Sequence, residues 1–318
     1  MNKHLPPAAK GMNLRFAEGE RRFLVTGATG FIGKQLVRAL LRDGHRVAIL
    51  TRQPDRATSI FEGVDCVSAM DQLPASRRFD TVINLAGAPV LGKRWTSARQ
   101  AALRQSRAGL TDDLVAWIAA AEHKPALMLS ASAIGFYGIQ QRGDERLLDE
   151  EAPPQPIFMS HLCREWEQAA QRADQHGVTV ALMRIGVVLG AEGALPMMLL
   201  PVKLGLGGPM GGGAQWLSWI HVDDVLGAMA HLCREGLGGA FNFTAPGVVT
   251  QAQFARTAAR LHRRPSFMPT PAFPVRLALG EQADLLLEGQ RISSQKLQAS
   301  GFTFAYPQLE AALRSLAG

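Results

Sequence analysis

The sequence predicts an α/β protein in which a doubly wound parallel sheet carries a smaller C-terminal α+β lobe. Three observations predict it: a glycine-rich turn between an apolar run and a helix-like segment, a regular alternation of strand-like and helix-like segments, and a change to glycine- and proline-rich sequence after residue 190. With 318 residues, 47% of them hydrophobic and 19% charged, the chain can bury one large core together with a smaller lobe.

The turn Thr26-Gly27-Ala28-Thr29-Gly30-Phe31-Ile32-Gly33 is the most informative segment, because it follows the apolar run 23–25 and opens the helix-like segment 31–42. Glycines at these spacings let the backbone turn tightly and approach a pyrophosphate, and the first N–H groups of the helix face that anion. A turn without a ligand is the alternative, but the flanking strand and helix favour a dinucleotide site in a Rossmann sheet. The expected cofactor contacts in this turn are Thr26, Gly27, Thr29, Gly30, Phe31, Ile32 and Gly33.

Strand-like and helix-like segments follow the turn in alternation. Apolar runs of strand length occupy residues 45–51, 64–68, 80–86, 126–130 and 178–183. Helix-like segments separate most of them, including 99–121, with apolar residues at helical spacing, and 158–176. This order predicts parallel strands with helices on both faces of the sheet.

The domain organisation follows from changes in sequence texture. Residues 1–20 lack periodicity and are expected to be a flexible tail. Residues 21–189 are expected to form the nucleotide-binding Rossmann domain, with 218–236 returning to it. The substrate lobe is then expected to comprise 190–217 and 237–318, and its glycine-rich loop 205–213 to lie over a ligand cleft, with a surface loop as the alternative.

Composition argues against several classes of partner. The net charge of +7 comes from scattered arginines without interleaved aromatic residues, so no nucleic-acid surface is expected. No apolar run approaches the roughly 20 residues of a membrane span, and residues 1–20 are too polar for a signal peptide, so we expect no membrane partner and a cytoplasmic protein. Cys66, Cys163 and Cys233 are far apart, which predicts reduced thiols and no metal site. A monomer or a homodimer is equally compatible with the sequence.

Several motifs in the expected order resemble one known superfamily. They are the turn at 26–33, Asn-Leu-Ala-Gly at 84–87, the stretch 130–138, Arg184 with Gly190, and Trp-Ile-His-Val-Asp-Asp-Val at 219–225. Together they resemble the extended short-chain dehydrogenases/reductases. Within these, three sets of segments are similar to an NAD-dependent epimerase/dehydratase group also called SulA-like or cell-division-inhibitor-like epimerases. They are 84–95, then 205–209 with 219–221, and 280–281 with 289–291 and 301–302. The resemblance spans about residues 22–317.

The resemblance implies where the cofactor lies and which one it is. In such proteins an acidic residue after the second strand binds the adenosine ribose of NAD, whereas this chain has Thr51-Arg52 there. An arginine suits the additional phosphate of NADP, so NADP is expected and NAD is disfavoured; a solvent-facing Arg52 is the alternative. Leu85, Ala86 and Gly87 are expected on the nicotinamide side of the cleft.

The resemblance also implies chemistry that this chain lacks in part. Relatives use a serine or threonine after the fifth strand, which Ser132 matches, and a tyrosine followed four residues later by lysine, which lowers the tyrosine pKa for proton transfer. The chain contains two tyrosines, and neither lies in segment 158–176. Depending on register, the pair is replaced by Phe158 and Leu162 or by Met159 and Cys163.

Four residues are candidates for contacting a substrate. Arg94 and Arg107 could bind a phosphate or carboxylate near the end of the fourth strand. Tyr137 lies near the cleft by analogy, and His161 is a titratable residue on the helix that lacks the catalytic pair, although an exposed, inert His161 is the simpler interpretation. The substrate is expected to be a small molecule of unknown identity, with sugar nucleotides among the candidates.

Two functions of different kinds remain open. One is an NADP-dependent oxidoreductase or epimerase, in which Ser132 holds a carbonyl oxygen and an unidentified acid/base or water replaces the tyrosine. The other is a dinucleotide-binding regulatory protein without turnover, for example in cell division or redox sensing. Whether the protein is an enzyme at all stays undecided by the sequence.

Overall fold

A seven-stranded parallel sheet forms the centre of the protein, for which a computed structural model describes residues 14–266, 268–269 and 271–317. Its strands are β1 (Arg22–Thr26), β2 (Arg46–Leu50), β3 (Asp65–Val67), β4 (Thr81–Asn84), β5 (Leu127–Ala133), β6 (Thr179–Ile185) and β10 (Gly239–Phe243). The spatial order is β10-β6-β5-β4-β1-β2-β3, and every neighbouring pair is parallel. The order changes direction between β1 and β4, which is where open α/β sheets bind ligands.

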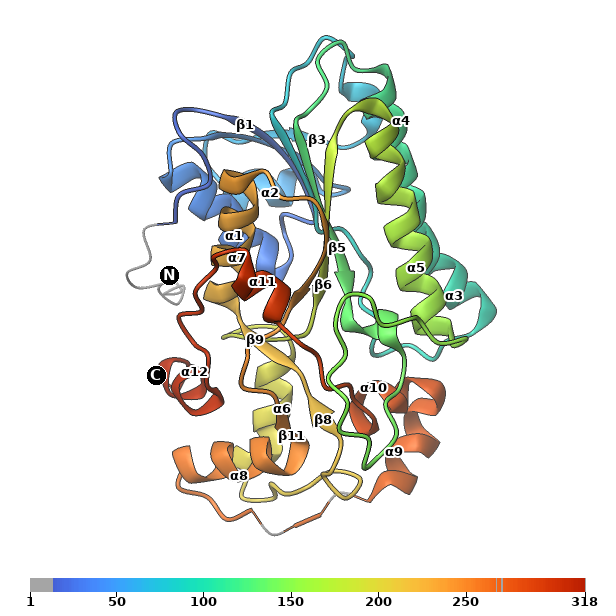
Figure 1. Cartoon of the computed structure of the whole chain (residues 1–318), viewed down its shortest axis with the longest axis vertical. Coiled ribbons are helices and arrows are strands. Elements are labelled where there is room, and N and C mark those ends of the chain that lie inside the picture. The colour runs from blue at the N-terminus through green and yellow to red at the C-terminus, as the bar shows by residue number, and fades with distance from the viewer. Residues whose placement is uncertain (1–13, 267, 270, 318) are drawn as a thin grey trace.

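Helices cover both faces of the sheet (Figure 1). The helices of the two layers are α1 (Phe31–Arg42), α2 (Pro54–Ile60) and α7 (Val222–Glu235) on one side, and α3 (Ser97–Arg104), α4 (Leu110–Ala120) and α5 (Phe158–Gln171) on the other. A π-helical turn, Gln105–Gly109, joins α3 to α4, and a 3-10 turn, Arg172–His176, continues α5. The two long helices expected from the sequence are therefore present with irregular turns. Among the helices of the described ranges, none is long and apolar enough to cross a membrane.

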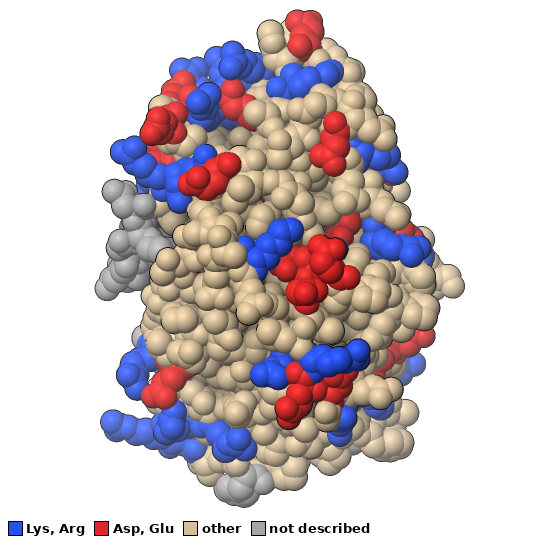
Figure 2. Space-filling view, viewed as in Figure 1, with Lys and Arg blue, Asp and Glu red and all other residues tan. Residues whose placement is uncertain are grey.

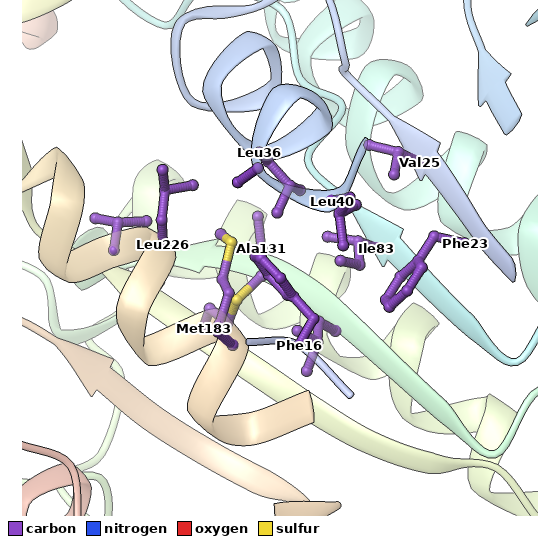
Figure 3. Packing of buried hydrophobic residues seen from close by; sticks show 14 of the residues in the cluster. Phe16, Phe23, Val25, Leu36, Leu40, Ile83, Ala131, Met183 and Leu226 are labelled. Atoms are coloured by element: carbon purple, nitrogen blue, oxygen red, sulfur yellow. The ribbon is translucent and has the colours of Figure 1, made fainter. Parts of the chain in front are cut away.

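The sheet is buried on both faces, as the alternation of side chains along β1 illustrates. Phe23 and Val25 pack with Leu36 and Leu40 of α1 on one face (Figure 3), whereas Leu24 packs with Leu114 of α4 on the other. Strands buried on both faces are typical of parallel sheets between helix layers, so the apolar runs of the sequence need not alternate with polar residues.

The smaller lobe has its own elements and its own apolar core. Its elements are β7 (Val187–Leu189), α6 (Ala194–Lys203), β8 (Trp216–Leu217), β9 (Trp219–His221), β11 (Val249–Thr250), α8 (Gln251–Leu261), α9 (Ala272–Leu279), α10 (Asp284–Leu287) and α12 (Leu309–Ser315). Leu189, Trp219, Phe254 and Leu313 belong to one cluster in this lobe. The predicted fold class, a Rossmann sheet with a smaller α+β lobe, is confirmed.

The structure differs from the expected organisation at two points and adds a contact of the loop 205–213. Residues 1–13 of the expected tail lie outside the described residues, but Phe16 is fully buried against the sheet core and its N–H donates to Asp43 Oδ2 at 2.7 Å. The burial of Phe16 could not be predicted, because a single apolar residue produces no periodic pattern. β10 pairs with β6 in the large sheet although it was expected in the lobe. Loop 205–213 packs on the start of α8, where the Met210 N–H donates to Gln251 Oε1 at 2.8 Å.

Candidate functional site

The glycine turn is packed so closely against β4 that side chains cannot enter it. Gly27 has φ +69°, and a Cβ atom there would lie 2.5 Å from the Leu85 carbonyl oxygen. At Gly33 a Cβ atom would lie 2.2 Å from the Gly27 carbonyl oxygen, whereas at Gly30 the same oxygen is 3.2 Å away. Gly27 and Gly33 are therefore required for the backbone packing, and Gly30 leaves room in front of α1.

The N-terminus of α1 offers its backbone donors to an anion. Gly30 is the N-cap, no side chain caps the helix, and its first turn contains no acidic residue. Unpaired N–H groups at such a helix start bind phosphate favourably. Phe31 at the first helical position is held by the segment after β7, because a Cβ atom at Gly190 would lie 2.3 Å from its ring.

A buried polar network fixes the end of β4 beside the turn. The Thr26 hydroxyl donates to Asn84 Oδ1 at 2.7 Å and accepts from the Ala86 N–H at 3.2 Å. Asn84 Nδ2 in turn donates to Thr111 Oγ1 at 2.8 Å and to Ser130 Oγ at 3.3 Å. These bonds hold Leu85 and Ala86 against the turn, so the structure brings together the two segments predicted to contact the cofactor.

Arg52 follows β2 with an exposed side chain. Among the described residues it has no hydrogen bond through its guanidinium, while the neighbouring Thr51 hydroxyl accepts from the Gln53 N–H at 3.2 Å. The end of β2 therefore presents a free cation and no carboxylate. That donor set fits a phosphate better than a ribose hydroxyl.

Ser132 lies at the end of β5, as expected, but its hydroxyl is engaged in a buried ion pair. It donates to Glu167 Oε1 at 2.6 Å, and Arg184 holds both carboxylate oxygens of Glu167 at 2.9 Å. A hydroxyl has one proton, so Ser132 cannot donate to a substrate carbonyl oxygen while this bond is formed. This differs from the expected role, because the carboxylate of Glu167 was not anticipated.

The structure selects between the two registers for the missing tyrosine and lysine. A Cβ atom added to Gly135, just after β5, would lie 3.3 Å from the methyl carbon of Met159 and 3.8 Å from Cys163 Sγ. Phe158 instead packs on Trp95, with ring centroids 5.0 Å apart. Met159 and Cys163 thus face the end of β5. Burial raises the pKa of Cys163 to about 12, so at neutral pH the group is an inert thiol.

Tyr137 points into the core and is not free for a substrate. It is 2% exposed, its hydroxyl donates to Asn242 Oδ1 at 2.6 Å, and it accepts from Arg184 Nη1 at 3.0 Å. Burial raises its pKa to about 12. The expected contact with a substrate is therefore replaced by a link between η3 (Ile134–Tyr137), β6 and β10.

Arg107 is the predicted substrate residue that lies next to the cofactor segment. It sits in the π-helical turn, and its guanidinium carbon would lie 3.1 Å from a Cβ atom at Gly87. Nη2 donates to the Ala88 carbonyl at 3.0 Å, and the guanidinium lies 5.2 Å from the centre of the Trp166 ring. Burial lowers the pKa of Arg107.

The remaining candidates are less closely associated with the turn. Arg94 is exposed and donates to the Leu277 carbonyl at 2.7 Å, which ties the loop after β4 to α9. His161 is half-buried on α5. His221 has a structural role, because its ring accepts from the Asp223 N–H at 3.1 Å and so caps α7. Within the described residues, no three metal-ligating side chains cluster.

Sequence reasoning missed Glu167, which joins Ser132 to Arg184. One signal was available: Glu167 follows Cys163 by four residues on α5, so both face the same side of the helix, toward β5. Asn242 was missed as well. It lies on β10, which the sequence had placed in the other lobe, so the residues around Tyr137 could not be assembled beforehand.

Fold and site together define a Rossmann protein with a dinucleotide-type glycine turn at the point where the strand order changes direction. The particular family follows from sequence comparison. The chain belongs to the NAD dependent epimerase/dehydratase family, whose pattern matches residues 23–243, and a domain of unknown function, DUF1731, matches residues 270–316.

Relatives are found in bacteria and in humans, and this chain covers two of them over almost their full length. Epimerase family protein YfhF of Bacillus subtilis is 37% identical over 298 residues, which cover 92% of this chain and 96% of that protein. Human epimerase family protein SDR39U1, solved with NADPH, is 35% identical with a TM-score of 0.83, covering 93% of this chain and 99% of that one. A nucleoside-diphosphate sugar epimerase of Corynebacterium glutamicum is 28% identical with a TM-score of 0.74, covering 94% of this chain and 59% of that one.

Proposed function

We propose that the protein binds NADP(H) and exchanges hydride between the nicotinamide and a small-molecule substrate. The observation that carries the proposal is the glycine turn packed on the end of β4, with the exposed Arg52 in place of a carboxylate after β2. The human relative solved with NADPH supports this choice of cofactor. The name of the Corynebacterium glutamicum relative supports a sugar nucleotide, or a compound like it, as the substrate.

Each part of the site has a defined task in this proposal. Gly27 and Gly33 let the backbone approach the pyrophosphate, and the N-terminus of α1 stabilises its charge. Arg52 pairs with the phosphate that distinguishes NADP from NAD. When bound, the nicotinamide supplies or accepts the hydride. Because Met159 and Cys163 occupy the positions of the catalytic pair, water or another acid/base must carry the proton.

Cofactor titrations test the proposal. We expect NADPH to bind more tightly than NADH, by roughly tenfold or more, since a charge-assisted hydrogen bond is worth about 1.5–3 kcal/mol. Calorimetry with Arg52→Ala should remove the preference and leave NADH binding nearly intact. Arg42→Ala, at the opposite end of α1, is the matched control and should keep the preference. Equal affinities in the unaltered protein would refute the assignment of Arg52.

A second candidate is a dinucleotide-binding regulatory protein without turnover, linked for example to cell division or redox sensing. It is favoured by the bond from Ser132 to Glu167 and by the inert side chains of Met159 and Cys163. To separate the two, NADPH-loaded protein is incubated with a panel of nucleotide sugars and their keto derivatives. Loss of reduced nicotinamide supports the enzyme, and tight binding without any oxidation supports the regulatory protein.

The proposal includes a cytoplasmic location, membership of the SulA-like group, and a monomer or homodimer without a nucleic-acid or membrane partner. The visible face in Figure 2 supports the lack of a nucleic-acid partner, because basic and acidic side chains alternate across it and form no continuous basic stripe. Sedimentation of the purified protein with and without NADPH distinguishes a monomer from a dimer.

A further inference from the structure

Two arginines are more than nine-tenths buried in the described part of the chain, and only one of them has a carboxylate partner there. Arg184 pairs with Glu167, whereas Arg107 forms no ion pair with any described residue. A buried guanidinium without a counter-ion is unfavourable, because the charge loses its hydration and gains no opposite charge in return. Such a group is commonly retained where a ligand supplies the anion.

The bonds that Arg107 does make do not neutralise it. Its Nη2 donates to the Ala88 carbonyl, Nη1 makes a long bond of 3.4 Å to Ser106 Oγ, and Nε has no partner among the described residues. A guanidinium has five N–H donors in a planar fork that matches a carboxylate or phosphate. A backbone carbonyl satisfies one of these donors and brings no negative charge.

A second cation lies beside Arg107. Arg99 on α3 donates to the Pro89 carbonyl, the residue after the one that Arg107 holds, and its Nε is buried without a partner among the described residues. The positive charge of Arg99 lowers the pKa of Arg107 after the larger effect of burial. Two like charges next to each other in a partly buried position increase the need for an anion.

The position of Arg107 and Arg99 indicates which ligand carries the anion. Arg107 contacts Gly87, which directly follows Leu85 and Ala86 on the predicted nicotinamide side. Its π-helical turn interrupts α3 and α4 at this point, and such turns inside helices are frequent at functional sites. The expected pyrophosphate site at the start of α1 follows β1, whereas Arg107 lies beside Gly87, which follows β4, the neighbour of β1 in the sheet. Arg107 is therefore placed for the substrate side of the cofactor.

We propose that Arg107, assisted by Arg99, binds a carboxylate or phosphate group of the substrate next to the nicotinamide. This inference rests on the proposed function and specifies its substrate class: a small molecule with an anionic group close to the carbon that exchanges hydride. Arg107 binds that group through its planar fork, and Arg99 adds attraction from the adjacent turn of α3. Uncharged sugars or alcohols would leave both guanidiniums without an anionic partner.

Binding of simple anions to the cofactor-loaded protein tests this inference. Malonate and inorganic phosphate are titrated by calorimetry into protein saturated with NADP⁺. We expect Arg107→Gln to bind both anions at least about tenfold more weakly than the unaltered protein. The matched control is Arg104→Gln on α3, whose arginine is half-buried and pairs with Glu165. This variant should bind both anions as tightly as the unaltered protein.

Three results would overturn the inference. One is equal anion binding by the unaltered protein and Arg107→Gln, including no binding by either. Another is anion binding that disappears on saturation with NADP⁺, because the guanidinium would then serve the phosphates of the cofactor. If Arg107→Gln fails to fold, Arg99→Gln is used in its place and should weaken anion binding about threefold. Unchanged anion binding by Arg99→Gln is the third result that would overturn the inference.

The same variants separate this inference from the proposed function. Arg107→Gln should keep the affinity for NADPH and its preference over NADH, because Arg52 and the turn at α1 are untouched. If Arg107→Gln keeps both its NADPH binding and its anion binding, the result contradicts the role of Arg107 and leaves the proposed function intact. Loss of the NADPH preference in the unaltered protein contradicts the proposed function, whatever the anions do.

Discussion

Arg184 and Arg107 are buried to nearly the same extent, 5% and 9% exposed, yet their surroundings differ completely. Burial lowers the pKa of Arg184, but the two hydrogen bonds and the charge of Glu167 outweigh burial, so that this pKa is raised. For Arg107 burial dominates and the pKa is lowered. The comparison separates a cation that the fold itself neutralises from one whose neutralisation is left to a ligand.

Arg184 is at the centre of a buried hydrogen-bond network. Arg184 donates to Glu167, to the Tyr137 hydroxyl and to the Glu150 carbonyl, and Ser132 completes the set by donating to Glu167. These contacts join β5, β6, α5 and η3, so this region determines how the strand ends lie relative to one another. Ser132, for which the family resemblance implied a catalytic role, is part of this buried network.

The largest effect should come from breaking the buried pair. Glu167→Gln leaves Arg184 buried without its charge partner, so we expect the free energy of unfolding to fall by about 3–5 kcal/mol. Urea denaturation measures the change. Glu165→Gln, two residues earlier on α5, breaks the half-exposed pair with Arg104, whose side chains are 42% and 39% exposed, and should cost no more than about 1 kcal/mol. Similar losses in the two variants would contradict the structural role of the Glu167 pair.

Most of the fold was predictable because its signals are local. The turn at 26–33 and the strands β1, β4 and β5 are each predicted by residues that are adjacent in sequence. Parallel pairing follows from the alternation of strands with helices. β10 was assigned to the wrong lobe because its place depends on pairing with β6, which is distant in sequence. The burial of Phe16 was missed because a single apolar residue forms no periodic hydrophobic pattern.

The site was predictable only where backbone geometry determines it. The required glycines at 27 and 33 could be recognised from spacing, whereas the orientation of Ser132 toward Glu167 depends on the packing of α5 against β5. The register of the replaced pair likewise needed the position of Gly135. Arg107 was recognised as a candidate from its type and position, but its lack of a carboxylate partner is a three-dimensional property.

An intermediate effect is expected from Ser132→Ala, which tests whether this serine belongs to the Arg184 region. The variant removes the hydroxyl that donates to the buried carboxylate of Glu167, a charge-assisted hydrogen bond worth about 1.5–3 kcal/mol. Urea denaturation should show that loss. Ser130→Ala is the control, because Ser130 accepts one neutral bond of 3.3 Å from Asn84 and should cost less. An unchanged stability for Ser132→Ala would free this serine for a role in catalysis.

The smallest effect on stability should come from Arg107→Met, although Arg107 is nearly as buried as Arg184. The substitution loses the bond to the Ala88 carbonyl and the contact with Trp166, but it also removes a charge that the fold does not neutralise. The two contributions are opposite in sign, so we expect the free energy of unfolding to change by no more than about 1 kcal/mol in the cofactor-free protein. Arg184→Met, which leaves Glu167 buried and unpaired, should cost about 3–5 kcal/mol in the same urea experiment. If Arg107→Met were as destabilising as Arg184→Met, the two buried arginines would have the same structural function, and the difference between their surroundings would carry no information about a ligand.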